Sequence, residues 1–255
     1  MVEIKTPAEI EAMAEAGKIV AAALAAVGAH AAPGVSLLEL DEIARTVLAD
    51  SGATSPFLGY QPAFAPTPFP AVICTSVNDA IVHGIPGRYR LRDGDLLSVD
   101  CGALLDGWAG DAAVSLTVGR PRPDDLALIA TTQTALEAAI ALCVPGGRIG
   151  DLGHAIARTG RAAGYGIPDD FGGHGIGRTM HEDPHVANRG RPGRGLTLRP
   201  GLVLAIEPMF TAGGTDGYVT APDGWTLSSA DGSRAAHVEH TVAVTDDGPR
   251  VLTRP

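Results

Sequence analysis

The chain has 255 residues, of which 45% are hydrophobic and 19% are charged, as in an ordinary soluble globular protein. Its net charge of −10 argues against nucleic acid as the main partner, because phosphate binding needs a basic surface. Three cysteines without a Cys-x-x-Cys spacing, no signal peptide and an apolar run (residues 19–29) too short to span a bilayer predict a cytoplasmic protein without disulfides or membrane contact.

The chain opens with a helix signal. Thr6 is a candidate N-cap, with Pro7 at the first helical position and Glu9 at the third. Apolar residues at helical spacing continue this helix. Pro33 and Gly34 then predict its end.

Further elements follow in the order helix, strands, helices, strands. The expected helices cover residues 37–49, 124–142 and 149–163, and the expected strands cover residues 72–75, 96–100, 112–118, 203–207 and 238–244. A proline-rich loop spans residues 61–70.

The two halves of the chain look like copies of one unit. The tetrapeptide Ile-Ala-Arg-Thr occurs at residues 43–46 and again at 156–159, each time in a helix that follows Pro-Gly. The repeat could arise by chance, but the shared order of elements favours duplication. We therefore expect a single α+β domain over residues 1–255, with pseudo-twofold halves of about 1–120 and 121–255 and a site between them.

Four carboxylates stand in stretches that are otherwise expected to be buried: Asp100, Asp111, Glu207 and Glu239. A buried carboxylate is costly unless it is paired or binds a metal. No lysine or arginine lies within three residues of any of the four. They therefore predict one or two hard divalent cations, and their apolar flanks disfavour the alternative that they are surface residues.

An Asp-Gly pair at residues 106–107 predicts a two-residue hairpin turn. In that register Asp100 lies opposite Ala113, so Asp111 shares a face with Asp100 as a diagonal neighbour. A bulge would change the register, and the alternative is that one of the two is an ordinary turn aspartate. The preferred interpretation is a carboxylate pair on one sheet face.

Histidines are weak evidence when each is taken alone. His174 lies among the glycines of residues 172–177, and His83 and His181 are further candidates. The glycines do not form a strand–GxGxxG–helix unit, so a nucleotide-binding loop is set aside. The remaining histidines are expected to be structural or exposed: His30, His154, His185, His237 and His240.

Taken together, the motifs at residues 78–86, 100–111, 173–184, 206–208 and 239–241 resemble those of type I methionine aminopeptidase in order and spacing. The resemblance covers nearly the whole chain. It implies the pita-bread fold, an α+β fold whose pseudo-twofold duplicated halves share a central antiparallel sheet flanked by helices, with two metal ions. By position, Asp100 would bind one ion, His174 and Glu207 the other, and Asp111 and Glu239 would bridge them.

The resemblance also implies a substrate site. His83 and His181 would lie just outside the metal ligands and contact the substrate. The pocket for methionine would use Tyr60, Cys74, Trp225, Phe57 and Phe69. The loop at residues 61–68 is longer than is usual in the family, which leaves the placement of Phe69 open.

The implied reaction removes the N-terminal methionine of nascent proteins and peptides, with a preference for a small second residue. Two divalent ions (Co, Mn, Fe or Zn) would share a bridging water and supply hydroxide near neutral pH. Glu207 would carry the proton to the leaving amine. His181 would polarise the carbonyl or stabilise the oxyanion, and His83 would contact the scissile amide nitrogen.

The resemblance leaves a transient ribosome contact open, and we expect a monomer. One alternative is an Xaa-Pro aminopeptidase or dipeptidase of the same fold, which usually carries an extra N-terminal domain. Another is a metal-free binding protein, which the complete ligand set disfavours.

Overall fold

The structure is a computed structural model that describes residues 2–63 and 65–254. Its helices are α1 (Pro7–His30), α2 (Leu37–Asp50), α3 (Pro123–Ile140) and α4 (Ile149–Ala162). Its strands are β1 (Ile73–Val77), β2 (Ala80–Val82), β3 (Leu96–Leu105), β4 (Trp108–Thr117), β5 (Gly172–Gly175), β6 (Glu182–Ala187), β7 (Val203–Ile206), β8 (Met209–Thr211), β9 (Tyr218–Thr220), β10 (Leu227–Ser229), β11 (Ala235–His237), β12 (Glu239–Thr245) and β13 (Gly248–Val251).

The four predicted helices are all present, and their ends lie close to the predicted positions. Helix α1 begins with the expected capping box, in which the Thr6 hydroxyl accepts from the Glu9 backbone N–H and the Glu9 carboxylate accepts from the Thr6 N–H. The five predicted strands correspond to β1, β3, β4, β7 and β12. The remaining strands were not predicted. Most of them span only three or four residues, too few to show a period, and the six residues of β6 include Pro184, which argues against a strand.

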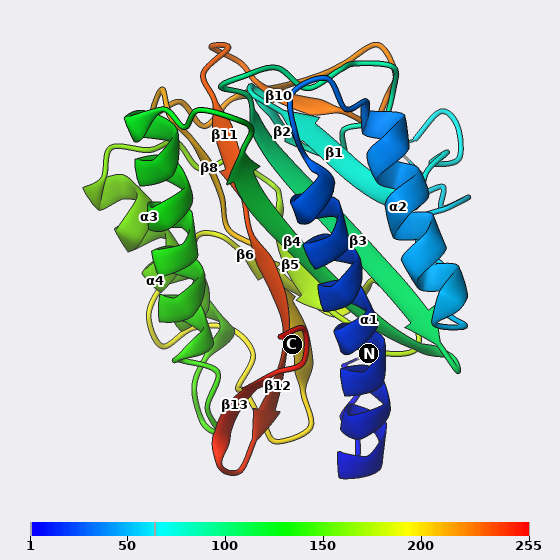
Figure 1. The fold of residues 1–255 in the computed structure, drawn as a ribbon. Helices are drawn as coiled ribbons and strands as arrows, with labels where there is room; N and C mark the ends of the chain where they lie inside the picture. Colours follow the sequence, from blue (N-terminus) through cyan, green and yellow to red (C-terminus); the bar gives the residue numbers. More distant parts are fainter. Residues whose placement is uncertain (1, 64, 255) are drawn as a thin grey trace.

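The main sheet is antiparallel, with strand order β1-β3-β4-β12-β7-β5-β6 and with β13 paired to β12. In Figure 1, α1 and α2 lie over β1, β3 and β4, whereas α3 and α4 lie beside β11, β12 and β6. Two separate cores join the helices to the sheet. One is formed by α1, α2, β1, β3 and neighbouring segments, and the other by α3, α4, β7, β12 and neighbouring segments.

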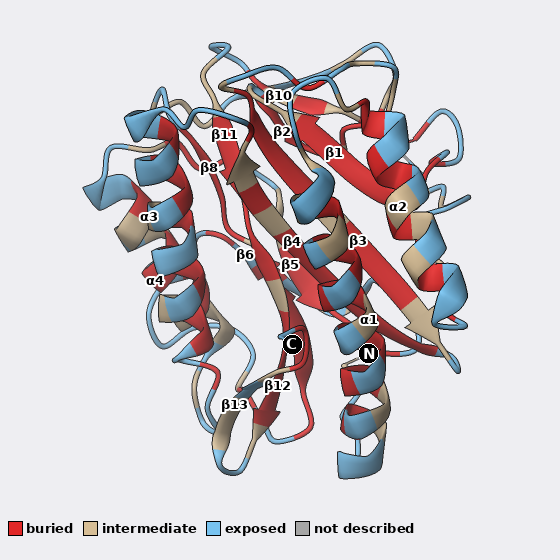
Figure 2. Cartoon of the chain, viewed as in Figure 1, coloured by how far each residue is buried: buried red, intermediate tan, exposed pale blue. Residues whose placement is uncertain are grey.

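Alternation along β3 assigns its side chains to two different environments. Leu97, Val99 and Cys101 are fully buried in the core under α1 and α2. Ser98 and Asp100 therefore point to the opposite face of the sheet. Figure 2 shows the sheet as a mostly buried layer, although its second face carries polar groups. Polar residues buried in this way need partners of their own.

Helix α1 has 24 residues, and its most apolar 18-residue window has a mean hydropathy of 1.5, so by length and composition alone it could cross a membrane. The apolar run at residues 19–29, which was predicted to be too short to span a bilayer, lies within this helix. In the structure Met13, Ala16 and Val20 of α1 are fully buried. The helix approaches β4 so closely that a Cβ on Gly110 would lie 2.9 Å from the backbone nitrogen of Gly17. Such packing identifies α1 as a core helix.

Candidate metal centre and substrate cavity

The predicted hairpin has the predicted register. Asp100 on β3 is the partner of Ala113 on β4, and the turn joins Leu105 to Trp108. Asp111 is the partner of Gly102, so it is the diagonal neighbour of Asp100 on the face away from α1. No bulge interrupts the pairing between these strands.

One row of residues crosses four strands and sets the spacing of the site. Cys74 pairs with Asp100, Asp100 with Ala113, and Ala113 with Glu239. The small methyl group of Ala113 therefore lies between two carboxylate-bearing positions. A larger residue would fill the space between these acids.

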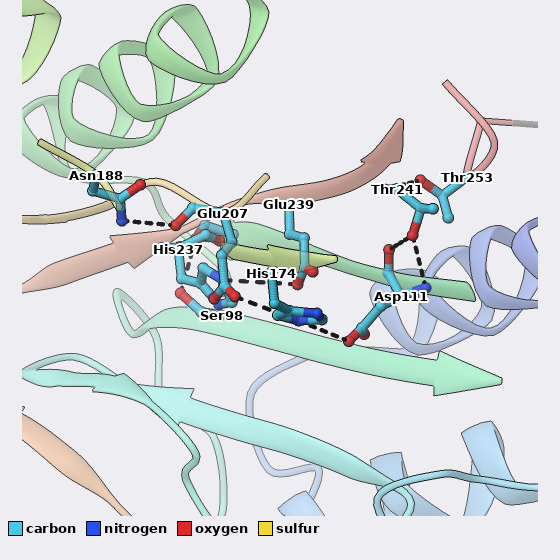
Figure 3. A network of polar contacts seen from close by, with 10 residues as sticks. Ser98, Asp111, His174, Asn188, Glu207, His237, Glu239, Thr241 and Thr253 are labelled. Carbon is cyan, nitrogen blue, oxygen red and sulfur yellow. Dashed lines mark hydrogen bonds and ion pairs between the residues drawn. The ribbon is translucent and has the colours of Figure 1, made fainter. Parts of the chain in front are cut away.

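His174 on β5 lies between two of the acids, as Figure 3 shows. Its Nε2 lies 3.7 Å from Oε1 of Glu207 and 4.0 Å from Oδ2 of Asp111. Its Nδ1 lies 2.9 Å from the carbonyl oxygen of Gly175. Because a carbonyl only accepts hydrogen bonds, Nδ1 carries the hydrogen, and the lone pair of Nε2 is free to bind a cation.

The donor atoms gather into two groups that share one residue. Asp111, His174 and Glu239 form one group, and Glu207, His237 and Glu239 form the other, with ligand-type atoms within 4.8 Å of one another in each. Several buried oxygens have no hydrogen-bond partner among the described residues, including Asp100 Oδ1, Asp111 Oδ1 and Glu239 Oε1. Oxygen-rich groups with unpartnered buried atoms fit divalent cations.

Without a cation this cluster holds protons. Burial raises the pKa of Asp100 to about 7, with the charge of Glu207 adding to the shift and His237 opposing it. Burial and neighbouring carboxylates raise the pKa values of Asp111 and Glu239 well above their ordinary values. Burial also acts on Glu207, but His237 and His174 outweigh it and lower the Glu207 pKa. Cation binding must therefore displace protons from this site.

His83 and His181 lie close to the acids and line the same cavity. The imidazole rings of His181 and His174 have centroids 4.3 Å apart. His83 has a φ of 60°, in the left-handed region, and backbone hydrogen bonding between Thr75 and Gly84 holds the adjoining turn. Burial lowers the pKa of each histidine to about 4, and His174 adds to the effect on His181. Both imidazoles are therefore neutral at pH 7.

A cavity of about 360 Å³ adjoins the acids. Its apolar wall is a buried cluster that includes Phe57, Phe69, Cys74, Met180 and Trp225, with Tyr60 packed against it. The position of Phe69 is fixed by backbone hydrogen bonds to Gly59 and Tyr60, and its ring lies 5.1 Å from that of Trp225. All the residues expected in the substrate pocket thus line one cavity.

The long loop at residues 61–68 forms part of the support for this wall. The indole N–H of Trp225 donates to the carbonyl oxygen of Thr67 at 3.0 Å. Pro66 packs so closely on Gly224 that a Cβ on this glycine would lie 2.4 Å from Pro66 Cγ. The loop therefore helps to fix the Trp225 ring.

Sequence reasoning missed several residues of the site. His237 was expected to be structural or exposed, yet its Nε2 lies 3.3 Å from Oε2 of Glu207 and its side chain is buried. The signal was available, because His237 precedes Glu239 by two residues and so shares its face in an extended chain. Phe171 and Met209 also line the cavity, and no pattern in the sequence identified them.

A buried lysine also escaped prediction. The Lys5 side chain is 3% exposed, and its ammonium group pairs with the carboxylate of Glu182, which follows His181. The same carboxylate accepts from the backbone N–H of Thr179. The N-terminal segment is thereby tied to the loop that carries His181.

Comparison with known proteins agrees with this geometry. Residues 11–246 match the sequence profile of Metallopeptidase family M24. The chain is 54% identical over 256 residues to methionine aminopeptidase 1 of Mycobacterium tuberculosis, covering 98% of this chain and 94% of that protein. It is 42% identical over 255 residues to methionine aminopeptidase 1 of Bacillus subtilis, covering 100% of both chains.

Solved structures give the same result for the fold. The methionine aminopeptidase of Thermotoga maritima superposes with a TM-score of 0.95 at 40% identity, covering 100% of both chains. The prolidase from Pyrococcus furiosus superposes with a TM-score of 0.77 at 24% identity, covering 99% of this chain and 65% of that one, and so shows the fold alone. The predicted resemblance and the α+β pita-bread fold are confirmed. The chain therefore belongs to metallopeptidase family M24.

Proposed function

We propose that this protein is a metal-dependent methionine aminopeptidase that removes the N-terminal methionine from peptides and nascent proteins. The observation that carries the proposal is the contact between the apolar cavity and the cluster of acids. The ring of Tyr60 lies 5.3 Å from that of His181, which in turn lies 4.3 Å from that of His174. A substrate residue whose apolar side chain fills the cavity would thus place its backbone carbonyl beside the candidate ligand atoms.

Asp100, Asp111, His174, Glu207 and Glu239 are proposed to hold two divalent cations. Buried oxygens of Asp100, Asp111 and Glu239 without a hydrogen-bond partner among the described residues support cation binding, and the number two follows from the resemblance to type I methionine aminopeptidase. Carboxylates with one imidazole accept manganese, iron, cobalt or zinc. Such ions, when bound, lower the pKa of a water molecule, so that hydroxide is available near neutral pH to attack the carbonyl of the first residue.

Glu207 is the proposed proton carrier between the attacking water and the leaving amine. It is the one member of the acid cluster whose pKa is lowered, so at neutral pH it is ionised and can accept a proton. His181 is proposed to donate its single N–H to the carbonyl oxygen as negative charge develops there. His83, also neutral, is proposed to contact the scissile amide nitrogen.

The cavity supports methionine as the first residue. Its lining includes the aromatic rings of Tyr60, Phe69 and Trp225, and a thioether makes favourable contacts with such rings. A preference for a small second residue is supported by His83 and Phe171, whose ring centroids are 6.2 Å apart beside the site. Phe171 in turn packs on Tyr218, with ring centroids 5.0 Å apart. The side of the site formed by His83 and Phe171 therefore has little room to accommodate a large second residue.

The proposed setting is the cytoplasm, with the protein acting as a monomer on chains that emerge from the ribosome. A net charge of −10 argues against a stable contact with ribosomal RNA, which would need a basic surface, so any ribosome contact is proposed to be transient.

A peptide series tests the proposed function. Cobalt- or manganese-loaded protein should release methionine from Met-Ala-Ser and Met-Gly-Ser, but little from Met-Leu-Ser. Acetyl-Met-Ala-Ser should not react, because the free amine is blocked. Cleavage of Ala-Pro-Ser in preference to Met-Ala-Ser would instead support an Xaa-Pro peptidase. Release from the acetylated peptide would contradict an aminopeptidase of any kind.

A further inference from the structure

His237 is a buried histidine at the acid cluster that the proposed reaction does not yet use. Its side chain is 2% exposed, and Nε2 has no hydrogen bond of good geometry with any described residue. Nε2 lies 3.3 Å from Oε2 of Glu207 and 3.9 Å from Oε2 of Glu239. A buried imidazole nitrogen aimed at two carboxylates calls for a functional explanation.

The fold holds the backbone of His237 firmly. The hydroxyl of Ser115 donates to the His237 carbonyl oxygen at 2.7 Å and accepts from its N–H at 3.0 Å. The Ser115 hydroxyl also contacts that of Ser98 at 2.8 Å. On the other side, β11 pairs with β8 so that His237 is the partner of Met209, two residues after Glu207. The backbone of His237 is therefore held from both sides.

The two oxygens of Glu207 face two different histidines. Oε1 lies 3.7 Å from Nε2 of His174, and Oε2 lies 3.3 Å from Nε2 of His237. The backbone carbonyl of Glu207 accepts from the side-chain amide of Asn188 at 3.0 Å, so the main chain is also held. Figure 3 shows Glu207 between Asn188, His237 and His174. Oε1 of Glu207 is thus directed to the other candidate metal-ligand atoms, and Oε2 is directed to His237.

We infer that His237 is a positioning residue, whose Nε2–H holds Oε2 of Glu207 and thereby keeps Oε1 beside the other residues that would hold a cation. The inference rests on the proposed function, since Glu207 is both a ligand and the proton carrier there. Groups that orient a ligand from outside typically contribute roughly 10–100-fold to metal affinity. Loss of His237 should therefore weaken cation binding and slow turnover while leaving the methionine cavity unchanged.

Three substitutions separate positioning from other roles. His237→Gln keeps an N–H donor at about the reach of Nε2, whereas the amide of His237→Asn is one methylene shorter and cannot reach Glu207. His237→Leu removes the donor altogether. His154→Leu is the control, because His154 is an exposed residue of α4. Cation affinity is measured by competition with a chromophoric chelator for Mn²⁺ and Co²⁺, and kcat and KM are measured on Met-Ala-Ser.

We expect His237→Gln and His154→Leu to match the wild-type affinity. His237→Asn and His237→Leu should lose roughly 10–100-fold in affinity and show a lower kcat with unchanged KM at saturating metal. If His237→Leu does not fold by circular dichroism, the comparison of the Gln and Asn variants decides the question.

Two results would overturn the inference. Equal affinity in all four variants would show that His237 does not hold Glu207. An equally large loss in His237→Gln and His237→Leu would make His237 a direct ligand. The chelator competition needs no peptide, so a wild-type protein that binds cations but releases no methionine would refute the proposed function without deciding this inference.

Discussion

The ring of Tyr60 lies 5.3 Å from that of His181, at an interplanar angle of 34°. Tyr60 belongs to the apolar cavity, whereas His181 lies beside the acids, so this contact joins the pocket to the candidate metal centre. The two parts come from segments more than one hundred residues apart in the chain. Movement of either ring would change how a bound side chain aligns its carbonyl with the ligand atoms.

Glu207→Gln should preserve the fold and lower kcat roughly 10²–10⁴-fold, because an amide cannot accept the proton from water. Turnover is measured after metal content has been brought to the wild-type level. Near-normal kcat in a metal-replete Glu207→Gln protein would remove this residue from the proton-transfer step.

His181→Ala should lower kcat about 10²–10³-fold through loss of a donor to the developing oxyanion. Metal content by mass spectrometry should be unchanged, because no ligand is lost. The exposed His154 on α4 gives the control His154→Ala, which should leave both quantities unchanged. Should His181→Ala lose its metal, His181 would be a ligand and its proposed role would be wrong.

Ala113→Val should weaken cation binding, because Ala113 lies in register between Asp100 and Glu239. Added methyl groups in a filled site typically cost about 1–3 kcal/mol, which is roughly ten- to hundredfold in affinity. Ala113→Ser is the matched control, since its volume is close to that of alanine. Wild-type affinity in Ala113→Val would show that the space for the cations lies elsewhere.

The metal-free protein should lose stability as the pH rises from 7 to 8. Burial raises the pKa of Asp100 to about 7, and those of Asp111 and Glu239 well above their ordinary values. The folded state therefore holds protons that the unfolded chain has already released, and each retained proton contributes at most about 1.4 kcal/mol per pH unit. The stability that these protons contribute is fully present below the pKa values of the unfolded carboxyl groups. It is lost as the pH rises through their pKa values in the folded protein.

Thermal unfolding of chelator-treated protein measures this effect. The Tm should fall between pH 7 and pH 8 without metal and should change little with saturating Mn²⁺, since cations replace the protons. The pH range of the measurement begins at pH 7 because histidines of the unfolded chain change their protonation below that pH. A Tm that stays constant or rises in the metal-free protein would contradict the raised pKa values.

Much of the fold could be predicted from local signals. The capping box at Thr6 gave the start of α1, and the Asp-Gly turn gave the register that brings Asp111 beside Asp100. Each signal depends only on residues that are close in the sequence, so it can be recognised without knowledge of the tertiary structure. The boundary between the two proposed halves near residue 120 stays a prediction.

The rest of the site depends on contacts between distant segments. Lys5 forms a buried ion pair with Glu182, and the indole N–H of Trp225 donates to the carbonyl oxygen of Thr67. No local sequence pattern indicates either contact. His237 could have been found by alternation, because it shares a face with Glu239. The sequence alone could not show that β11 lies next to β8, which brings His237 to Glu207.

We propose that the acids and His174 bind cations that activate water beside a methionine pocket. The most direct test is the release of free methionine from Met-Ala-Ser by metal-stripped protein that is titrated with Mn²⁺ or Co²⁺. We predict no release without metal and release that rises with added metal until the site is saturated. Full activity in the metal-stripped protein, or no release at any metal loading from folded protein, would contradict the claim.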